Sequence, residues 1–272
     1  MQWTAIRLVV MLSIIQGWHT RQLDFVLAYP QAKVEGEIYM RLSEGFKLSG
    51  NRNSKTHMLK LLKNIYGLKQ VGRVWNQHFH SGLSKLGYQQ SDIDPCSYYK
   101  GKLLLAVYID DCIMASEEKE ELYQVIKELA DTFEITDEGE LDKYLGVKIE
   151  RREDGSVKMY QPYLITQILK AIGFHEKTKE KSMPAIARKI LHRDIEGEYL
   201  KTECEYARVI GQLNFREKST RPDIACAVHQ CARFTKDLRE SHKKAILHIG
   251  RYLLKTRNEG IIYKRLKLTQ AS

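Results

Sequence analysis

Two adjacent carboxylates interrupt an apolar stretch of the sequence. Leu103–Ile109 is apolar, Asp110 and Asp111 follow it, and Cys112–Ala115 is apolar again. Neighbouring ionised carboxylates repel each other and lose hydration in a tight turn, which is a poor arrangement for stability alone. A hard divalent cation resolves this conflict, because Mg²⁺ binds carboxylate oxygens together with substrate phosphates. The pair therefore indicates a metal site, with an exposed Asp-Asp turn as the alternative.

A third carboxylate, Asp24, lies in a separate segment that is rich in Phe, Val and Leu and is typical of a strand. If that strand pairs beside Asp110 and Asp111, the three carboxylates can hold two metal ions about 4 Å apart. Such a pair of ions serves in-line phosphoryl displacement. We therefore predict two Mg²⁺ (or Mn²⁺) ions as cofactors.

The elements that position these carboxylates follow from the apolar pattern. Lys102–Ala115 predicts a hairpin with both carboxylates at its tip. Gln22–Tyr29 predicts a strand that ends at Pro30, and Glu37–Leu42 predicts a second strand. Met1–Gly17 predicts a short helix rather than a signal peptide, since no small-x-small cleavage site follows it. The apolar spacing predicts that its buried residues are Ile6, Val9, Val10, Ser13 and Ile14.

Helical spacing dominates the later sequence. A helix is predicted over Trp75–Leu86, another after an N-cap at Ser116, and a second hairpin crosses Asp154 and Gly155. After Pro162 the predicted helices are Tyr163–Ile172, Tyr206–Phe215, Pro222–Phe234 and Ser241–Leu254. The fold class is therefore α+β over residues 1–162, followed by a mostly helical region over residues 163–272.

Charge divides the chain at about the same place. Residues 1–160 carry 21 basic and 22 acidic residues, whereas residues 161–272 carry 23 basic and 12 acidic residues. An excess of positive charge on one region suggests a polyanionic partner, although a merely soluble surface would have the same composition. Five cysteines without CxxC spacing favour a reducing compartment over a disulfide scaffold, and no apolar run is long enough to predict a membrane span.

Ordered motifs connect the chain to a known family. Tyr108–Asp111 resembles the Tyr-x-Asp-Asp box of reverse transcriptases, and Asp24–Tyr29 resembles their first catalytic motif. The whole chain is similar to Ty/copia-type retrotransposon reverse transcriptases. Further motifs of that family follow in its order: Gln22–Asp24, Ile38–Met40, Glu44–Phe46, Tyr66–Gln70 with Arg73 and Trp75, Asp94–Cys96, Tyr144–Gly146, Ile210–Leu213, Thr220–Ile224 and Arg251–Thr256.

The resemblance implies a reverse-transcriptase palm with partial fingers over residues 1–162. This palm is an antiparallel sheet that carries the Tyr-x-Asp-Asp hairpin and is backed by helices. The resemblance also implies a basic thumb and connection region over residues 163–272, ending before any ribonuclease H domain. The implied enzyme is an RNA-directed DNA polymerase that transfers nucleotides from dNTPs to a primer 3′-hydroxyl. The alternative is an inactive, truncated nucleic-acid-binding remnant of such an element.

The resemblance also implies roles for single residues and for partners. Asp24, Asp110 and Asp111 match the catalytic, metal-binding carboxylates. Tyr29, Gln70 and Tyr108 match nucleotide-binding positions, and Leu145 and Gly146 match the primer grip. Basic residues expected at the nucleic-acid backbone are Lys69, Arg73, Arg233, Lys243, Lys244, Arg251 and Lys255. The expected partners are an RNA or DNA template with its primer, dNTPs and other polyprotein products, in cytoplasmic virus-like particles or the nucleus.

Overall fold

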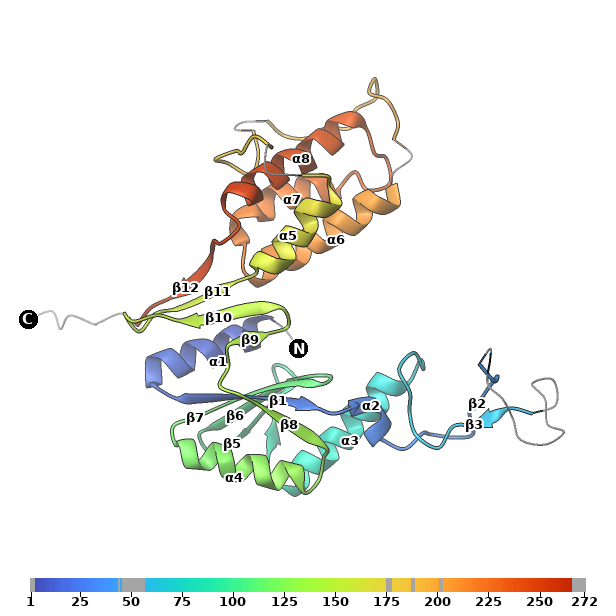
Figure 1. Cartoon of the computed structure of the whole chain (residues 1–272), viewed down its shortest axis with the longest axis vertical. Helices are drawn as coiled ribbons and strands as arrows, with labels where there is room; N and C mark the ends of the chain where they lie inside the picture. The colour runs from blue at the N-terminus through green and yellow to red at the C-terminus, as the bar shows by residue number, and fades with distance from the viewer. Residues whose placement is uncertain are drawn as a thin grey trace, which may run out of the picture. The chain divides into compact units, whose positions relative to one another are not determined.

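The computed structural model describes residues 3–43, 45, 57–174, 178–186, 189–200 and 203–265. The chain forms two compact units, Met1–Leu141 and Asp142–Ser272 (Figure 1). Both units combine helices with an antiparallel sheet, so the fold is mixed α+β with a largely helical C-terminal part. No helix in the described ranges is long and apolar enough to cross a membrane.

The first unit is built on a six-stranded antiparallel sheet with the order β4-β5-β6-β7-β1-β8. Its strands are β1 (His19–Phe25), β4 (Gln89–Gln90), β5 (Ser97–Lys100), β6 (Leu103–Tyr108), β7 (Asp111–Ser116) and β8 (Ile135–Gly139). Helix α1 (Trp3–Gln16) lies on one face, and α3 (Val71–Lys85) and α4 (Lys119–Ala130) lie on the other (Figure 1). The short elements α2 (Ala28–Gln31), β2 (Tyr39–Met40) and β3 (Leu59–Lys60) complete this unit.

An aromatic cluster fixes α3 against the sheet. The ring of Phe25 on β1 makes edge contacts with Trp75 at 5.7 Å, Phe79 at 5.1 Å and Phe133 at 5.5 Å between centroids. Such contacts contribute about 0.5–1.5 kcal/mol each beyond the area that they bury. The cluster therefore ties β1, one residue after Asp24, to the helix that follows the Tyr66–Gln70 motif.

The predicted N-terminal helix is confirmed as α1. Its buried residues are Ile6, Val9, Val10, Ser13 and Ile14, which are the positions expected from the apolar spacing. Its contacts are with β6 and β7, so α1 covers the sheet face opposite to the aromatic cluster.

The second unit joins a four-stranded antiparallel sheet, in the order β12-β11-β10-β9, to a group of helices. Its elements are β9 (Lys143–Tyr144), β10 (Val147–Arg151), β11 (Val157–Tyr160), α5 (Pro162–Ala171), α6 (Glu203–Ser219), the 3₁₀ turn η1 (Pro222–Ile224), α7 (Ala225–Ala232), α8 (Glu240–Lys255) and β12 (Gly260–Tyr263). Apolar residues of α5, α6, α7 and α8 form its buried core.

The two compact units divide after Leu141, whereas the sequence predicts a change from α+β to mostly helical structure near residue 162. Strand β12, which the sequence pattern did not predict, pairs with β11. The β10–β11 hairpin is therefore part of the second unit, because its partner strand comes from the chain that follows α8.

The following three predicted elements have different bounds in the structure. Strand β1 ends at Phe25, since Leu27 takes a left-handed φ of 48° and Pro30 lies inside α2. The turn of the first hairpin is Ile109 and Asp110, because Asp111 already belongs to β7. Helix α4 begins at Lys119 rather than directly after Ser116, which ends β7.

Candidate active site

The strand pairing brings the three aspartates to one end of the first sheet. Asp24 on β1 lies directly opposite Asp111 on β7, and Tyr108 on β6 pairs with Asp111 from the other side. The carbonyl of Asp110 accepts a hydrogen bond from the Phe25 amide at 2.8 Å. Asp24 therefore lies beside the hairpin, as the sequence predicted, although the segment that carries it is shorter.

The turn that presents Asp110 has a strained backbone. Ile109 has a φ of 59°, and a β-branched residue in this region is an outlier that costs about 1–3 kcal/mol. The Trp75 indole nitrogen donates a hydrogen bond to the Ile109 carbonyl at 3.0 Å. Helix α3 therefore holds the strained turn in place through the side chain of Trp75.

Tyr66 makes a second contact with the hairpin turn that the sequence patterns do not predict. Its hydroxyl donates a hydrogen bond to Oδ1 of Asp110 at 2.9 Å, and its ring lies 4.6 Å from that of Tyr29. Burial and the bond to Asp110 raise the pKa of Tyr66 to about 12, so the hydroxyl stays protonated and donating. In the sequence, Trp75 and Tyr66 stand out only as members of a motif. The one hint of these two contacts is chemical, because the ring N–H of a tryptophan and the O–H of a tyrosine usually find a hydrogen-bond acceptor when buried.

Negative charge accumulates at this end of the sheet. Burial raises the pKa of Asp24 above its usual value, and the nearby charge of Asp110 raises it further. The same two causes, in the same order, raise the pKa of Tyr29. A bound divalent cation would relieve this repulsion.

The donor set fits a hard cation in chemistry and in backbone position. Carboxylate oxygens are the ligands that Mg²⁺ prefers, and three of them come from adjacent positions of the sheet. Within the described residues, however, no three Asp, Glu, His or Cys side chains form a ready cluster for a metal. The three aspartates therefore share one end of the sheet without forming a ready cluster, and one oxygen of the Asp110 carboxylate accepts a hydrogen bond from Tyr66.

The predicted nucleotide-binding residues lie near this end of the sheet. A cavity of about 160 Å³ is lined by Tyr29, Gly72, Trp75, Tyr108 and neighbouring residues. Tyr29 and Tyr108 therefore share one hollow. Gln70 is the half-buried residue that immediately precedes α3.

Two predicted basic residues flank the start of α3. Lys69 is exposed. Arg73 forms an ion pair with Glu35 at 2.5 Å and a hydrogen bond with Gln77. Both partners of the ion pair are about half exposed, so it contributes less than about 1 kcal/mol. A phosphate could therefore replace Glu35 at little cost.

Leu145 and Gly146 form the two-residue turn between β9 and β10. Both have positive φ, 48° and 76°, which is typical of a type I′ hairpin. A Cβ on Gly146 would lie 2.9 Å from a methyl carbon of Leu164 on α5. The fold of the second unit therefore already requires a glycine at this position.

Helix α8 presents a basic stripe, which we define as Lys244, Arg251 and Lys255. These positions fall within about 40° of one another on a helical wheel, opposite to the buried Ile246 and Leu253. The other predicted residues lie elsewhere: Lys243 is exposed on the flank of α8, and Arg233 is exposed just after α7. The structure therefore brings together three of the seven predicted basic residues.

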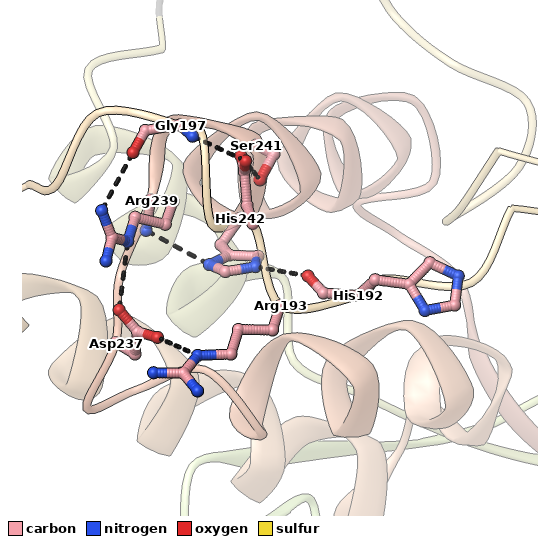
Figure 2. Close-up of polar contacts among 8 residues, drawn as sticks. His192, Arg193, Gly197, Asp237, Arg239, Ser241 and His242 are labelled. Carbon is pink, nitrogen blue, oxygen red and sulfur yellow. Dashed lines mark hydrogen bonds and ion pairs between the residues drawn. The ribbon is translucent and has the colours of Figure 1, made fainter.

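The start of α8 is held by a polar network (Figure 2). The Arg239 amide donates to Nδ1 of the buried His242 at 3.2 Å, and Nε2 donates to the His192 carbonyl at 3.0 Å. The Arg239 guanidinium donates to the Gly197 carbonyl and to Asp237. Both ring nitrogens of His242 are therefore committed to hydrogen bonds.

The end of α8 is held by Arg221, from the Thr220–Ile224 motif. Its guanidinium forms a two-point ion pair with Asp223, at 2.9 and 2.7 Å, and donates to the carbonyl and hydroxyl of Thr256. The hydroxyl of Tyr252 donates to the same carboxylate at 2.7 Å. This motif therefore has a structural role within the second unit.

Comparison with known proteins agrees with this geometry. Residues 1–187 match the family model described as reverse transcriptase (RNA-dependent DNA polymerase). The chain is 30% identical over 272 residues to a retrovirus-related Pol polyprotein from transposon TNT 1-94 of Nicotiana tabacum, covering 96% of this chain and 20% of the polyprotein. It is 28% identical over 266 residues to that from transposon RE1 of Arabidopsis thaliana, covering 96% and 18%.

A shorter relative is matched over most of its length. The chain is 28% identical over 249 residues to a putative transposon Ty5-1 protein of Saccharomyces cerevisiae, covering 89% of this chain and 78% of the relative. By contrast, it spans about a fifth of the plant polyproteins. With the family model matched over more than half of its residues, the chain belongs to the reverse transcriptases of the copia/Ty1-type retrotransposons.

Proposed function

We propose that this chain is an RNA-directed DNA polymerase that extends a primer 3′-hydroxyl with dNTPs on an RNA or DNA template. The observation that carries the proposal is the pairing of Asp24 with Asp111, beside the turn that holds Asp110, in a chain of the reverse transcriptase family. Two Mg²⁺ (or Mn²⁺) ions bound by these residues would ease deprotonation of the primer hydroxyl and neutralise charge on the triphosphate and pyrophosphate.

Residues around the aspartates would orient the nucleotide. Tyr29, whose ring packs at a tilt against that of Tyr66, would crowd the 2′ carbon of the sugar and so exclude a ribonucleotide sterically. Gln70 and Tyr108 would contact the incoming nucleotide and its templating base. Lys69 and Arg73 would contact phosphates, with Arg73 exchanging Glu35 for a nucleic-acid oxygen. Residues 1–162 would then act as the palm with partial fingers.

The turn at Leu145 and Gly146 would act as the primer grip, where a glycine lets backbone approach the primer end closely. Residues 163–272 would act as the thumb and connection region. The basic stripe of α8, with Lys243 and Arg233, would contact the phosphate backbone of the duplex. Such contacts are independent of sequence and weaken steeply with salt.

Primer extension on an RNA template with Mg²⁺ at low salt tests the proposal. We expect Asp110→Asn and Asp111→Asn to lower the extension rate at least about 10³-fold, because each removes a charged metal ligand. The matched control is Asp92→Asn, which neutralises an exposed aspartate of the same unit outside the site. This control should extend the primer like the wild type.

Two results of this experiment would contradict the proposal. A wild-type chain that binds primer–template with a steep salt dependence but does not extend it would be a nucleic-acid-binding remnant, and the polymerase proposal would be wrong. Extension that persists in both asparagine variants would show that the aspartates are not the catalytic ligands.

A further inference from the structure

Tyr66 makes a contact for which the packing of the core gives no reason. The residue is 49% exposed, in the connection between β3 and α3, so it buries little apolar surface. Nevertheless its hydroxyl lies 2.9 Å from Oδ1 of Asp110, which is 44 residues away in sequence. An exposed side chain held in this way points to a role at the site rather than in the core.

Asp110 is the carboxylate that most needs such a partner. It lies at the tip of a hairpin, is only half-buried, and follows the strained Ile109. Asp24 and Asp111, by contrast, belong to paired strands, which fix their backbone positions. A hydrogen bond to one oxygen fixes the plane of the Asp110 carboxylate and leaves Oδ2 for another ligand.

The ring of Tyr66 is itself held in position. It packs against the ring of Tyr29 with centroids 4.6 Å apart and planes inclined at 49°. The hydroxyl of Tyr29 in turn lies over Gly72, where an added Cβ would be 3.9 Å from it. Tyr66 is therefore placed by α2 and α3, independently of the hairpin that it contacts.

From this arrangement we infer that Tyr66 is a positioning residue for the metal centre: its hydroxyl fixes one oxygen of the Asp110 carboxylate and so directs the other oxygen to a divalent cation. The inference rests on the proposed function and adds a residue that does not touch the cation. Partners of this kind orient metal ligands elsewhere in proteins, and losing one lowers metal affinity about 10- to 100-fold.

Mn²⁺ binding to the full chain tests this inference without relying on turnover. Free Mn²⁺ is measured by electron paramagnetic resonance for the wild type, Tyr66→Phe and Asp110→Asn. We expect Tyr66→Phe to raise the dissociation constant about tenfold, because it removes the hydroxyl and keeps the ring against Tyr29. Asp110→Asn should lower the affinity further.

A matched control exists in the same unit. The hydroxyl of Tyr39 donates to a carboxylate oxygen of Glu37, also at 2.9 Å, on the strand β2. Tyr39→Phe removes the same kind of bond from a different carboxylate and should leave Mn²⁺ affinity unchanged. Added Mn²⁺ should restore primer extension in Tyr66→Phe and not in Asp110→Asn.

The outcomes separate this inference from the proposed function. Asp110-dependent Mn²⁺ binding that is unchanged in Tyr66→Phe would overturn the positioning role alone. Tighter binding in Tyr66→Phe would also overturn it, by showing that the hydroxyl competes with the cation. Wild-type protein without Asp110-dependent binding would overturn the metal centre and the positioning role together.

Discussion

The fold affects the charge of an aspartate in opposite ways in the two units, at Asp24 in the first and at Asp223 in the second. Burial raises the pKa of Asp223, but hydrogen bonds from Arg221 and Tyr252 together bring it below its usual value. At Asp24, burial raises the pKa and the charge of Asp110 adds to that effect. The fold therefore neutralises the carboxylate that joins η1 to α8 and leaves the charge at the sheet end to be neutralised by a ligand. An uncompensated carboxylate of this kind is the better marker of a functional site.

The largest expected effect follows from neutralising Asp24. Asp24→Asn should lower primer extension at least about 10³-fold, because a metal ligand is lost. The same change removes the repulsion with Asp110, so the free energy of unfolding should rise by about 1 kcal/mol. Measuring extension and unfolding on one preparation checks both signs. A variant that loses activity and also loses stability would contradict the comparison.

The second unit should respond in the opposite direction. Asp223→Asn leaves the guanidinium of Arg221, which is 1% exposed, without its charged partner. Breaking a buried ion pair costs about 3–5 kcal/mol, and the partly exposed carboxylate places this one at about 3 kcal/mol. Hydrogen exchange should show lost protection at the end of α8 and in η1. Asp154→Asn, which removes an ion pair to Lys264 at the exposed β10–β11 turn, is the control and should change neither.

Lowering the pH should reduce the difference in stability between each of these two variants and the wild type, for opposite reasons. The lowered pKa of Asp223 stabilises the native state above the usual carboxyl pKa, and this contribution is lost as pH falls through the lowered value. The raised pKa of Asp24 destabilises the native state at neutral pH, and this cost disappears as pH falls through the raised value. The stability of Asp24→Asn should therefore converge on that of the wild type from above as the pH falls from about 8 to about 4, whereas that of Asp223→Asn should converge from below only under about pH 4. Differences that stay constant with pH would contradict both assignments.

The same contrast separates what could be predicted from the sequence from what could not. The buried positions of α1 and the place of Asp24 beside the hairpin follow from apolar periodicity, which reports local structure and the buried face. The contacts of Tyr66 with Asp110 and of Trp75 with the Ile109 carbonyl depend on loop paths and on one positive φ. No periodic pattern records either of them.

The extent of the second compact unit also cannot be seen in the sequence pattern. Residues 142–160 have an ordinary hairpin pattern, and only the pairing of β12 with β11 assigns them to the second unit. A four-residue strand near the end of the chain carries too little pattern to reveal that pairing. The resemblance to a family implies the roles of the site residues, whereas only the structure shows which side chains contact them.

Two helical glycines extend the comparison from charge to packing. In the first unit, a Cβ on Gly82 of α3 would lie 2.4 Å from the ring of Phe133, inside the aromatic cluster. Gly82→Ala should therefore destabilise the protein by about 1–3 kcal/mol, in spite of the better helix propensity of alanine. Chemical denaturation measures this loss. Gly82→Ala together with Phe133→Leu should recover part of it if the steric contact is the cause.

Gly211 of α6 should give the smallest effect and the opposite sign. It is exposed, and a Cβ at this position meets nothing within 4 Å. Gly211→Ala should stabilise the second unit by up to about 1 kcal/mol, because glycine is the poorer helix former in a helix interior. Hydrogen exchange along α6 measures the gain. A loss of primer–template affinity in a stabilised Gly211→Ala variant would show that nucleic acid approaches the α6 backbone here, which would add this glycine to the proposed binding surface.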